Sequence, residues 1–380
     1  MVGSRRDIAP EHSELEISLF GPGYGESVVL HLGENAWFIM DSCIDPATGD
    51  PAPLEYLRQM QIDPATAVQQ VIATHWHDDH IRGLGRIVTV CETAEFVCSA
   101  ALRQNEFRTL VAAYGQRAMM TSPGVKEFYE VIQALKARGQ RPHLRGPTFA
   151  TASRCLWRRG VSDTGLQSES TIYALSPSDV SILLAHRHIA ALLPREGMTK
   201  LRVSALTPNH AAVVLWVTTG GASILLGSDL EETGHSGTGW SVILGSSTYP
   251  QGKASVFKIP HHGSQTADQP QVWHDMLHAE PLAILTPFVR GNVFLPTRHD
   301  VDRLCARTEH AYTTAVPRYR RRRGRPNAVT RTIRETVGSI REVIPSTGHV
   351  RLRANLTHQP ISWHVELFGD ACPLRQVHGV

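Results

Sequence analysis

The chain has 380 residues, of which 42% are hydrophobic and 19% charged, a composition typical of a globular protein with one large domain or two ordinary ones. No run approaches the roughly 18 to 20 apolar residues of a membrane span, and no apolar stretch follows Arg5 and Arg6, so we expect neither a membrane segment nor a secretory signal. The net charge of +3 excludes little, and six scattered cysteines without a CxxC pair are typical of reduced thiols in a cytoplasmic protein.

Short apolar runs bounded by turn residues predict strands, and longer amphipathic stretches predict helices. In chain order we expect strands over 15–20, 27–32 and 37–40, a helix over 52–62, a strand over 69–73, helices over 100–114 and 124–137, irregular structure over 146–200, strands over 213–218, 223–226, 255–259 and 282–286, a helix over 300–310, and strands over 349–353 and 362–368. Strands mixed with helices, without a regular βαβ repeat, favour an α+β sandwich over a doubly wound sheet.

Four metal-capable side chains follow the predicted strand 69–73 within six residues: His75, His77, Asp79 and His80. The two histidines at 75 and 77 face the same side if the loop stays extended, and the aspartate and histidine at 79 and 80 converge after a turn. Imidazole and carboxylate are suitable ligands for zinc and, less exclusively, for iron or manganese. The alternative is a polar surface loop that happens to be rich in histidine.

Two later strands also end in residues of this kind. Asp229 follows the strand 223–226, and His261 and His262 follow the strand 255–259. Ligands of open sheets lie just beyond strand ends, so three such ends indicate one shared edge. Taken singly, Asp229 could be a turn or helix-cap residue, and His261 could be an ordinary loop histidine.

Together, these motifs resemble the metallo-β-lactamase superfamily, and most nearly the hydrolase domain of bacterial DNA-uptake channel proteins and its soluble relatives. The elements that carry the resemblance are Gly23-Tyr24-Gly25-Glu26-Ser27, a strand ending in Asp41, His75-Trp76-His77-Asp78-Asp79-His80, Asn209-His210 before an apolar run, Ser228-Asp229, and His261-His262-Gly263-Ser264. They span about residues 15 to 310. The resemblance implies a single four-layer αββα metallo-β-lactamase sandwich, of class α+β, over residues 1–380. Residues 100–200 match nothing in the family, and we expect a partly helical insertion or lid there.

The resemblance also implies a site with two divalent metal ions, for which zinc is expected and manganese is the alternative. The implied metal ligands are His75, His77, Asp79, His80, Asp229 and His261, with the aspartate at 229 bridging the two ions. Asp41 is expected to hydrogen-bond a ligand histidine and fix its tautomer. Asn209 and His210 are further candidates, either as ligands or as supports of a ligand.

Two such ions would activate a bridging water, so we expect hydrolysis by a metal-bound hydroxide without a nucleophilic serine or cysteine. The candidate catalytic residues are Asp79 and His262. His262 is the candidate acid that protonates the leaving group.

An arginine-rich segment covers residues 318–341. It holds nine arginines and one acidic residue, nine minus one leaving +8, so the rest of the chain sums to about −5. Its central residues Arg320, Arg321, Arg322 and Arg323, beside Tyr319, are candidates for phosphate contacts and base stacking. A flexible linker or a protein-docking surface would have the same composition.

The segment and the resemblance favour a phosphodiesterase or nuclease that acts on nucleic acid. A hydrolase of a small ester, lactone or nucleotide is the alternative, with residues 100–200 closing its pocket. A binding or regulatory subunit with a structural metal site is an alternative of another class.

Overall fold

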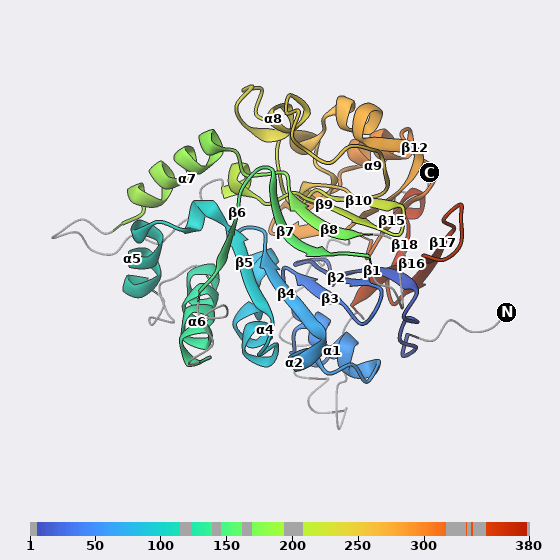
Figure 1. Ribbon diagram of the computed structural model, residues 1–380. Coiled ribbons are helices and arrows are strands. Elements are labelled where there is room, and N and C mark those ends of the chain that lie inside the picture. Colours follow the sequence, from blue (N-terminus) through green and yellow to red (C-terminus); the bar gives the residue numbers. More distant parts are fainter. Residues whose placement is uncertain are drawn as a thin grey trace.

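Two eight-stranded sheets lie face to face between layers of helices in the computed structural model of the chain (Figure 1). It describes residues 6–114, 123–138, 146–161, 169–193, 208–316, 332, 336 and 347–377. No helix within these ranges is long and apolar enough to cross a membrane.

The first sheet is formed by the N-terminal strands together with one hairpin from the end of the chain. Its order is β17 (Trp363–Phe368), β16 (Gly348–Asn355), β1 (Glu14–Gly21), β2 (Ser27–Leu32), β3 (Trp37–Met40), β4 (Val68–Ala73), β5 (Glu95–Ser99) and β6 (Thr148–Ala150). Its strands from β3 to β6 are parallel to one another, whereas those from β17 to β3 alternate in direction.

The second sheet is formed mainly by the C-terminal half. Its order is β18 (Cys372–Pro373), β15 (Ala311–Thr313), β12 (Leu277–Leu285), β11 (Ala254–Lys258), β10 (Ala222–Leu226), β9 (Leu215–Thr219), β8 (Ser170–Ala174) and β7 (Arg154–Arg159). The neighbours β10, β11, β12 and β15 are parallel. A separate hairpin joins β13 (Phe288–Arg290) to β14 (Val293–Leu295).

Helices cover the outer face of each sheet. The helices of the described residues are α1 (Ala52–Gln59), α2 (Pro64–Ala67), α3 (Asp78–Ile81), α4 (Leu84–Val90), α5 (Asn105–Tyr114), α6 (Pro123–Ala137), α7 (Asp179–Ala191), α8 (Gly239–Leu244) and α9 (Arg298–Cys305). Figure 1 shows α1, α2, α4 and α6 below the sheets and α8 and α9 above them. The predicted four-layer αββα arrangement is therefore confirmed.

The alternation of side chains along each strand explains the layers. On β9, Leu215 and Val217 point into the core between the sheets, whereas Trp216 joins the core beneath the outer helices. On β10, Ile224 faces the inner core and Leu225 the outer one. Both faces of these strands are buried, which explains why they read in the sequence as nearly continuous apolar runs.

The structure corrects the expectation that residues 146–200 are irregular. The described part of this stretch adds β6 to the first sheet, adds β7 and β8 to the second, and forms α7. The strand β7 is an edge strand with several exposed positions, so its sequence lacks the apolar signal of a buried strand.

Candidate metal centre

The histidine-rich loop begins where β4 ends. The main chain of Val213 donates a hydrogen bond to the carbonyl of Thr74 (3.1 Å) and holds the start of the loop against the second sheet. The short helix α3 then reverses the chain, so that the ring centroids of His75 and His80 lie 4.1 Å apart and those of His75 and His77 4.9 Å apart. His75, Asp79 and His80 are buried, and His77 is half-buried. The four groups of the loop thus meet in the interior.

Two strand ends of the second sheet supply the other side of the centre. Because β10 and β11 are parallel neighbours, their carboxyl ends lie at one edge of the sheet. Asp229 follows β10, and His261 and His262 follow β11. Ser228, His261 and His262 have φ angles of 47°, 47° and 54°, left-handed conformations that turn the chain sharply after each strand.

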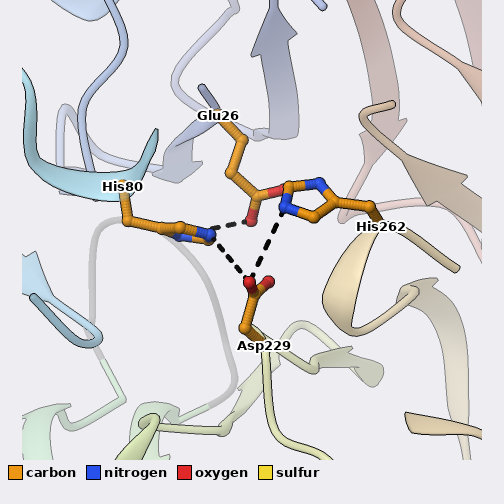
Figure 2. Close-up of side chains that lie close together, drawn as sticks. All are labelled: Glu26, His80, Asp229 and His262. Atoms are coloured by element: carbon orange, nitrogen blue, oxygen red, sulfur yellow. Dashed lines mark ion pairs between the residues drawn. The ribbon is translucent and has the colours of Figure 1, made fainter. Parts of the chain in front are cut away.

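Asp229 lies at the centre of the group. Its Oδ2 atom is 3.2 Å from Nε2 of His80, 3.6 Å from Nε2 of His262 and 3.9 Å from Nε2 of His75. Nε2 of His262 also lies 3.2 Å from Oδ2 of Asp79. Figure 2 shows Asp229 between His80 and His262.

Three overlapping sets of side chains have ligand atoms within 4.8 Å of one another in the described part of the chain. They are Glu26 with His80, Asp229 and His262; Asp41 with His75 and His80; and His75 with His77 and Asp229. The sequence motifs of the loop and of the two later strand ends therefore converge on one place.

Several polar atoms of the centre are buried without a hydrogen-bond partner among the described residues. They include Nε2 of His75, Nε2 of His80 and Oδ1 of Asp229. Each such atom costs about 1 to 3 kcal/mol if nothing satisfies it. Divalent cations bound in this group would satisfy all three, and a set of imidazoles and carboxylates fits zinc.

The pKa values of the side chains at the centre also indicate how a cation would bind there. Burial, followed by the neighbouring His80 and His77, lowers the pKa of His75 well below its usual range and keeps its imidazole neutral, as a metal ligand must be. Burial alone would raise the pKa of Asp229, but the rings of His80 and His262 beside it hold that pKa well below its usual range. Burial alone would lower the pKa of His80, but the carboxylates of Asp229, Glu26 and Asp41 raise it well above its usual range, so a metal ion that binds this ring must displace a proton.

Asp41 holds His80 in place from behind. Its carboxylate accepts a hydrogen bond from Nδ1 of His80 (2.8 Å), from the main chain of Thr74 (2.8 Å) and from Oγ1 of Thr74 (2.7 Å). With Nδ1 engaged, Nε2 of His80 is left to face the centre. This is the contact that the sequence predicted for Asp41.

A buried ion pair that the sequence analysis did not single out lies beside the centre. Glu26 pairs with Lys258, and its other oxygen accepts a hydrogen bond from Oγ1 of Thr286 (2.5 Å). Lys258 also donates to the carbonyl of Ser228 (2.9 Å). Glu26 lies 3.7 Å from Nδ1 of both His80 and His262. The available signal was a lysine at the end of an apolar strand, directly before the two histidines.

The structure exchanges the positions expected for the two adjacent histidines. His262, proposed from the sequence as the leaving-group acid, is buried and joins the set of ligand atoms. His261, expected as the ligand, lies outside the three sets at 21% side-chain exposure. Its Nδ1 contacts Glu231 (3.3 Å) and Thr266 (3.0 Å), and its Nε2 lies 3.4 Å from Asn209. Both histidines take left-handed φ angles, so the second ring, not the first, points inward.

The two candidates before β9 belong to none of the three ligand sets. Asn209 is buried and donates a hydrogen bond to Glu231 (2.9 Å), the residue that also contacts His261. The ring of His210 lies 5.9 Å from that of His188 and belongs to none of the three ligand sets. Burial lowers the pKa of His210. Arg320, Arg321, Arg322 and Arg323 lie outside the described residues.

Comparison with known proteins identifies the fold. Residues 20–115 match the family model described as the metallo-beta-lactamase superfamily, and this segment contains the histidine-rich loop. The chain thus has the metallo-β-lactamase fold, with two mixed sheets between helices.

Solved structures with a similar arrangement include proteins of distant sequence. The metallo-beta-lactamase fold protein YhfI from Bacillus subtilis is 12% identical, with 79% of this chain and 95% of that chain covered and a TM-score of 0.37. The hydrolase AbOPH in the beta lactamase superfamily is 13% identical, with 58% and 72% covered and a TM-score of 0.33. Zn²⁺-bound PqqB from Methylobacterium extorquens is 13% identical, with 53% and 51% covered and a TM-score of 0.23.

Proposed function

We propose that this protein is a hydrolase that works with two divalent metal ions. The observation that carries the proposal is the convergence of His75, His77, His80, His262 and Asp229 in the ligand sets, with three buried ligand atoms that have no other hydrogen-bond partner among the described residues. Asp79 lies outside these sets, but its Oδ2 atom is 3.2 Å from Nε2 of His262 and 3.8 Å from Nε2 of His80. In this proposal one ion is held by His75, His77 and Asp229. The other is held by Asp79, His80, His262 and the same Asp229.

Two bound cations lower the pKa of water and neutralise charge that develops on a phosphoryl or carbonyl oxygen. Other side chains of the protein orient the ligands and face the substrate. Asp41 fixes the orientation of His80, and the buried ion pair of Glu26 and Lys258 lies beside the centre. His261 stands at the rim, beside Glu231, where it can contact a bound substrate.

The proposed substrate is a phosphodiester of nucleic acid. Support comes from the arginine-rich segment 318–341, with its net charge of +8, and from the resemblance of the motifs to the hydrolase domain of DNA-uptake channel proteins. A segment of this charge would bind phosphates along a strand, while the metal ions act on one phosphodiester. We propose zinc as the resident metal, because imidazoles dominate the ligand set.

The test begins with the metal. Protein expressed with added zinc is expected to contain close to two ions per chain by elemental analysis, and to hydrolyse bis(p-nitrophenyl) phosphate. Nicking of plasmid DNA, or cleavage of single-stranded RNA, then identifies the natural phosphodiester. Protein without bound metal would contradict the metal centre, whereas two metals with turnover of esters or lactones alone would contradict the substrate.

Asp229→Ala is the sharpest variant, because this carboxylate contacts three imidazoles and is shared between both proposed ions. It is expected to lose metal and activity together. Asp370→Ala is its control, since Asp370 is exposed and belongs to none of the ligand sets.

A further inference from the structure

A cavity lies away from the metal centre and is lined by residues of α5, α6 and the neighbouring strands β5 and β6, of which β6 is the edge of the first sheet. Figure 1 labels these four elements. Its volume is about 460 Å³, within the range of pockets that hold small organic ligands. None of the side chains in the three ligand sets lines it. The cavity is therefore a separate feature of the described fold.

The interior of this cavity is aromatic. Phe96, Phe107, Phe128 and Phe149 come from four different elements and line it. The ring of Phe128 meets that of Phe107 edge-on at 5.2 Å and that of Phe96 at 6.4 Å. Such a wall is rigid and apolar, and it favours a ligand with a hydrocarbon or aromatic body.

The polar residues of the cavity all have the same charge. Arg103, Arg108 and Lys136 line it and are exposed, and no acidic residue is among its described lining residues. None of the three forms an ion pair with another described side chain, and the guanidinium of Arg103 lies over the ring of Phe149 at 5.8 Å. Three cations without acidic partners at the opening of an apolar cavity are complementary to a ligand with one anionic end.

We propose that this cavity binds a small amphipathic anion, with its apolar body among the phenylalanines and its carboxylate or phosphate between Arg103, Arg108 and Lys136. A chain of about ten carbons fits a cavity of this size. A fatty carboxylate and an alkyl phosphate share this chemistry, and the choice between them is an outcome of the test. The cavity also borders the catalytic loop indirectly, because Phe107 contacts Trp76, the residue between His75 and His77 (5.8 Å).

Isothermal titration of the full chain with decanoate, below its micelle concentration, tests the proposal. One molecule is expected to bind per chain, with decan-1-ol binding at least about fivefold more weakly and decyltrimethylammonium not binding. Decyl phosphate, titrated in parallel, shows which anionic group binds more tightly. No binding of decanoate, or equal binding of decanoate and decan-1-ol, would overturn the proposal.

Variants locate the site. The double variant Arg103→Gln, Arg108→Gln is expected to weaken decanoate roughly fivefold or more while decan-1-ol is unaffected, because both side chains are exposed and only the charge is lost. Arg298→Gln, an exposed arginine on α9, is the matched control and should change neither ligand. Leu135→Trp, which fills the cavity, should abolish both. Decanoate affinity unchanged in the double variant would place binding elsewhere and refute the assignment.

Discussion

The carboxylate of Asp229 is buried among nitrogen groups. It is 2% exposed, and its desolvation is offset by the rings of His80 and His262, with the ammonium of Lys258 3.9 Å from its Oδ1 atom. A buried aspartate needs positive charge nearby, which here can come from Lys258, from protonated imidazoles or from metal ions. The metal content of the purified protein therefore tests whether metal ions supply positive charge beside Asp229.

The two neighbouring histidines provide the most direct test at this scale. His262→Ala removes a ring that contacts both Asp79 and Asp229, so it is expected to lose one ion per chain and nearly all turnover. His261→Ala removes a rim contact and is expected to keep both ions while the apparent affinity for substrate falls. Elemental analysis and steady-state kinetics measure the two effects. If His261→Ala lost metal while His262→Ala kept both ions, His261 would be the metal ligand, as the sequence predicted.

The ion pair of Glu26 and Lys258 yields a prediction about stability. Lys258 is 1% exposed, and its replacement by Met leaves a buried carboxylate without its cation. Breaking one side of such a pair lowers the free energy of unfolding by about 3 kcal/mol. Urea denaturation of the metal-free protein measures the loss.

The double variant Glu26→Gln, Lys258→Met is the control for that ion pair. It removes both charges and is expected to recover a substantial part of the stability. A Lys258→Met protein as stable as the wild type would show that Glu26 is compensated by other groups.

At the scale of elements, α6 supports the histidine-rich loop through its first turn. The amide of Gly124 donates to the side chain of Asp78 (2.8 Å), and a Cβ atom at position 124 would lie 2.4 Å from the carbonyl of Trp76. Glu127 on the next turn accepts hydrogen bonds from the amides of Gly83 and Gly85. The loop that carries His75 and His77 is thus positioned partly by this helix.

Gly124→Ala is expected to push the loop away from α6 and to weaken metal binding, because Trp76 lies between His75 and His77, two of the proposed ligands. Titration with zinc, read by a competing chelator, should show at least a tenfold loss of affinity. Gly160→Ala is the matched control, since nothing lies within 4 Å of its added Cβ atom. Unchanged zinc affinity in Gly124→Ala would mean that the loop holds its shape without the helix.

The buried His31 on β2 makes the stability of the protein depend on pH. Burial, and to a smaller extent the nearby Arg159, lowers the pKa of His31 from 6.5 to about 3. Below pH 6.5 the unfolded chain binds a proton that the folded protein excludes until about pH 3, so stability is full above pH 6.5 and is lost as the pH falls toward 3.

The slope from this single group is about 1.4 kcal/mol per pH unit in that window. His31→Phe is expected to remove this contribution from the free energy of unfolding measured between pH 6 and pH 5, while the contact with Trp37 (ring centroids 4.6 Å apart) is kept. His274→Phe, at an exposed position, should leave the slope unchanged. An unaltered slope in His31→Phe would contradict a neutral, buried imidazole.

At the scale of the whole molecule, the sequence predicted most of the features that position the metal centre. Apolar strands followed directly by Asp229 and by His261-His262 indicated one shared edge, because parallel strands bring their carboxyl ends together. The sequence could not show which of the two histidines turns inward, since that depends on left-handed φ angles at both positions. It also placed the start of α9 too late. Thr297 and Asp300 form a capping box, so the helix begins at Arg298.

The last prediction concerns the arginine-rich segment and the proposed substrate. If Arg320, Arg321, Arg322 and Arg323 contact phosphates, replacing all four by Ser should weaken binding to nucleic acid of any sequence without changing metal content. Each phosphate contact contributes about −0.9 to the slope of log affinity against log salt on duplex, and about −0.7 on single strands. Loss of two to four contacts should therefore flatten that slope by roughly 2 to 3 units.

Hydrolysis of bis(p-nitrophenyl) phosphate should be unchanged in the same variant, because a small phosphodiester needs only the metal centre. Together with the salt dependence, this control distinguishes the possible roles of the arginine-rich segment. An unchanged salt slope would make it a linker, and loss of a protein partner with intact affinity for nucleic acid would make it a docking surface. A collapse of small-substrate turnover would show that the arginines are needed for the fold, and the proposal of a nucleic-acid substrate would then rest on the motifs alone.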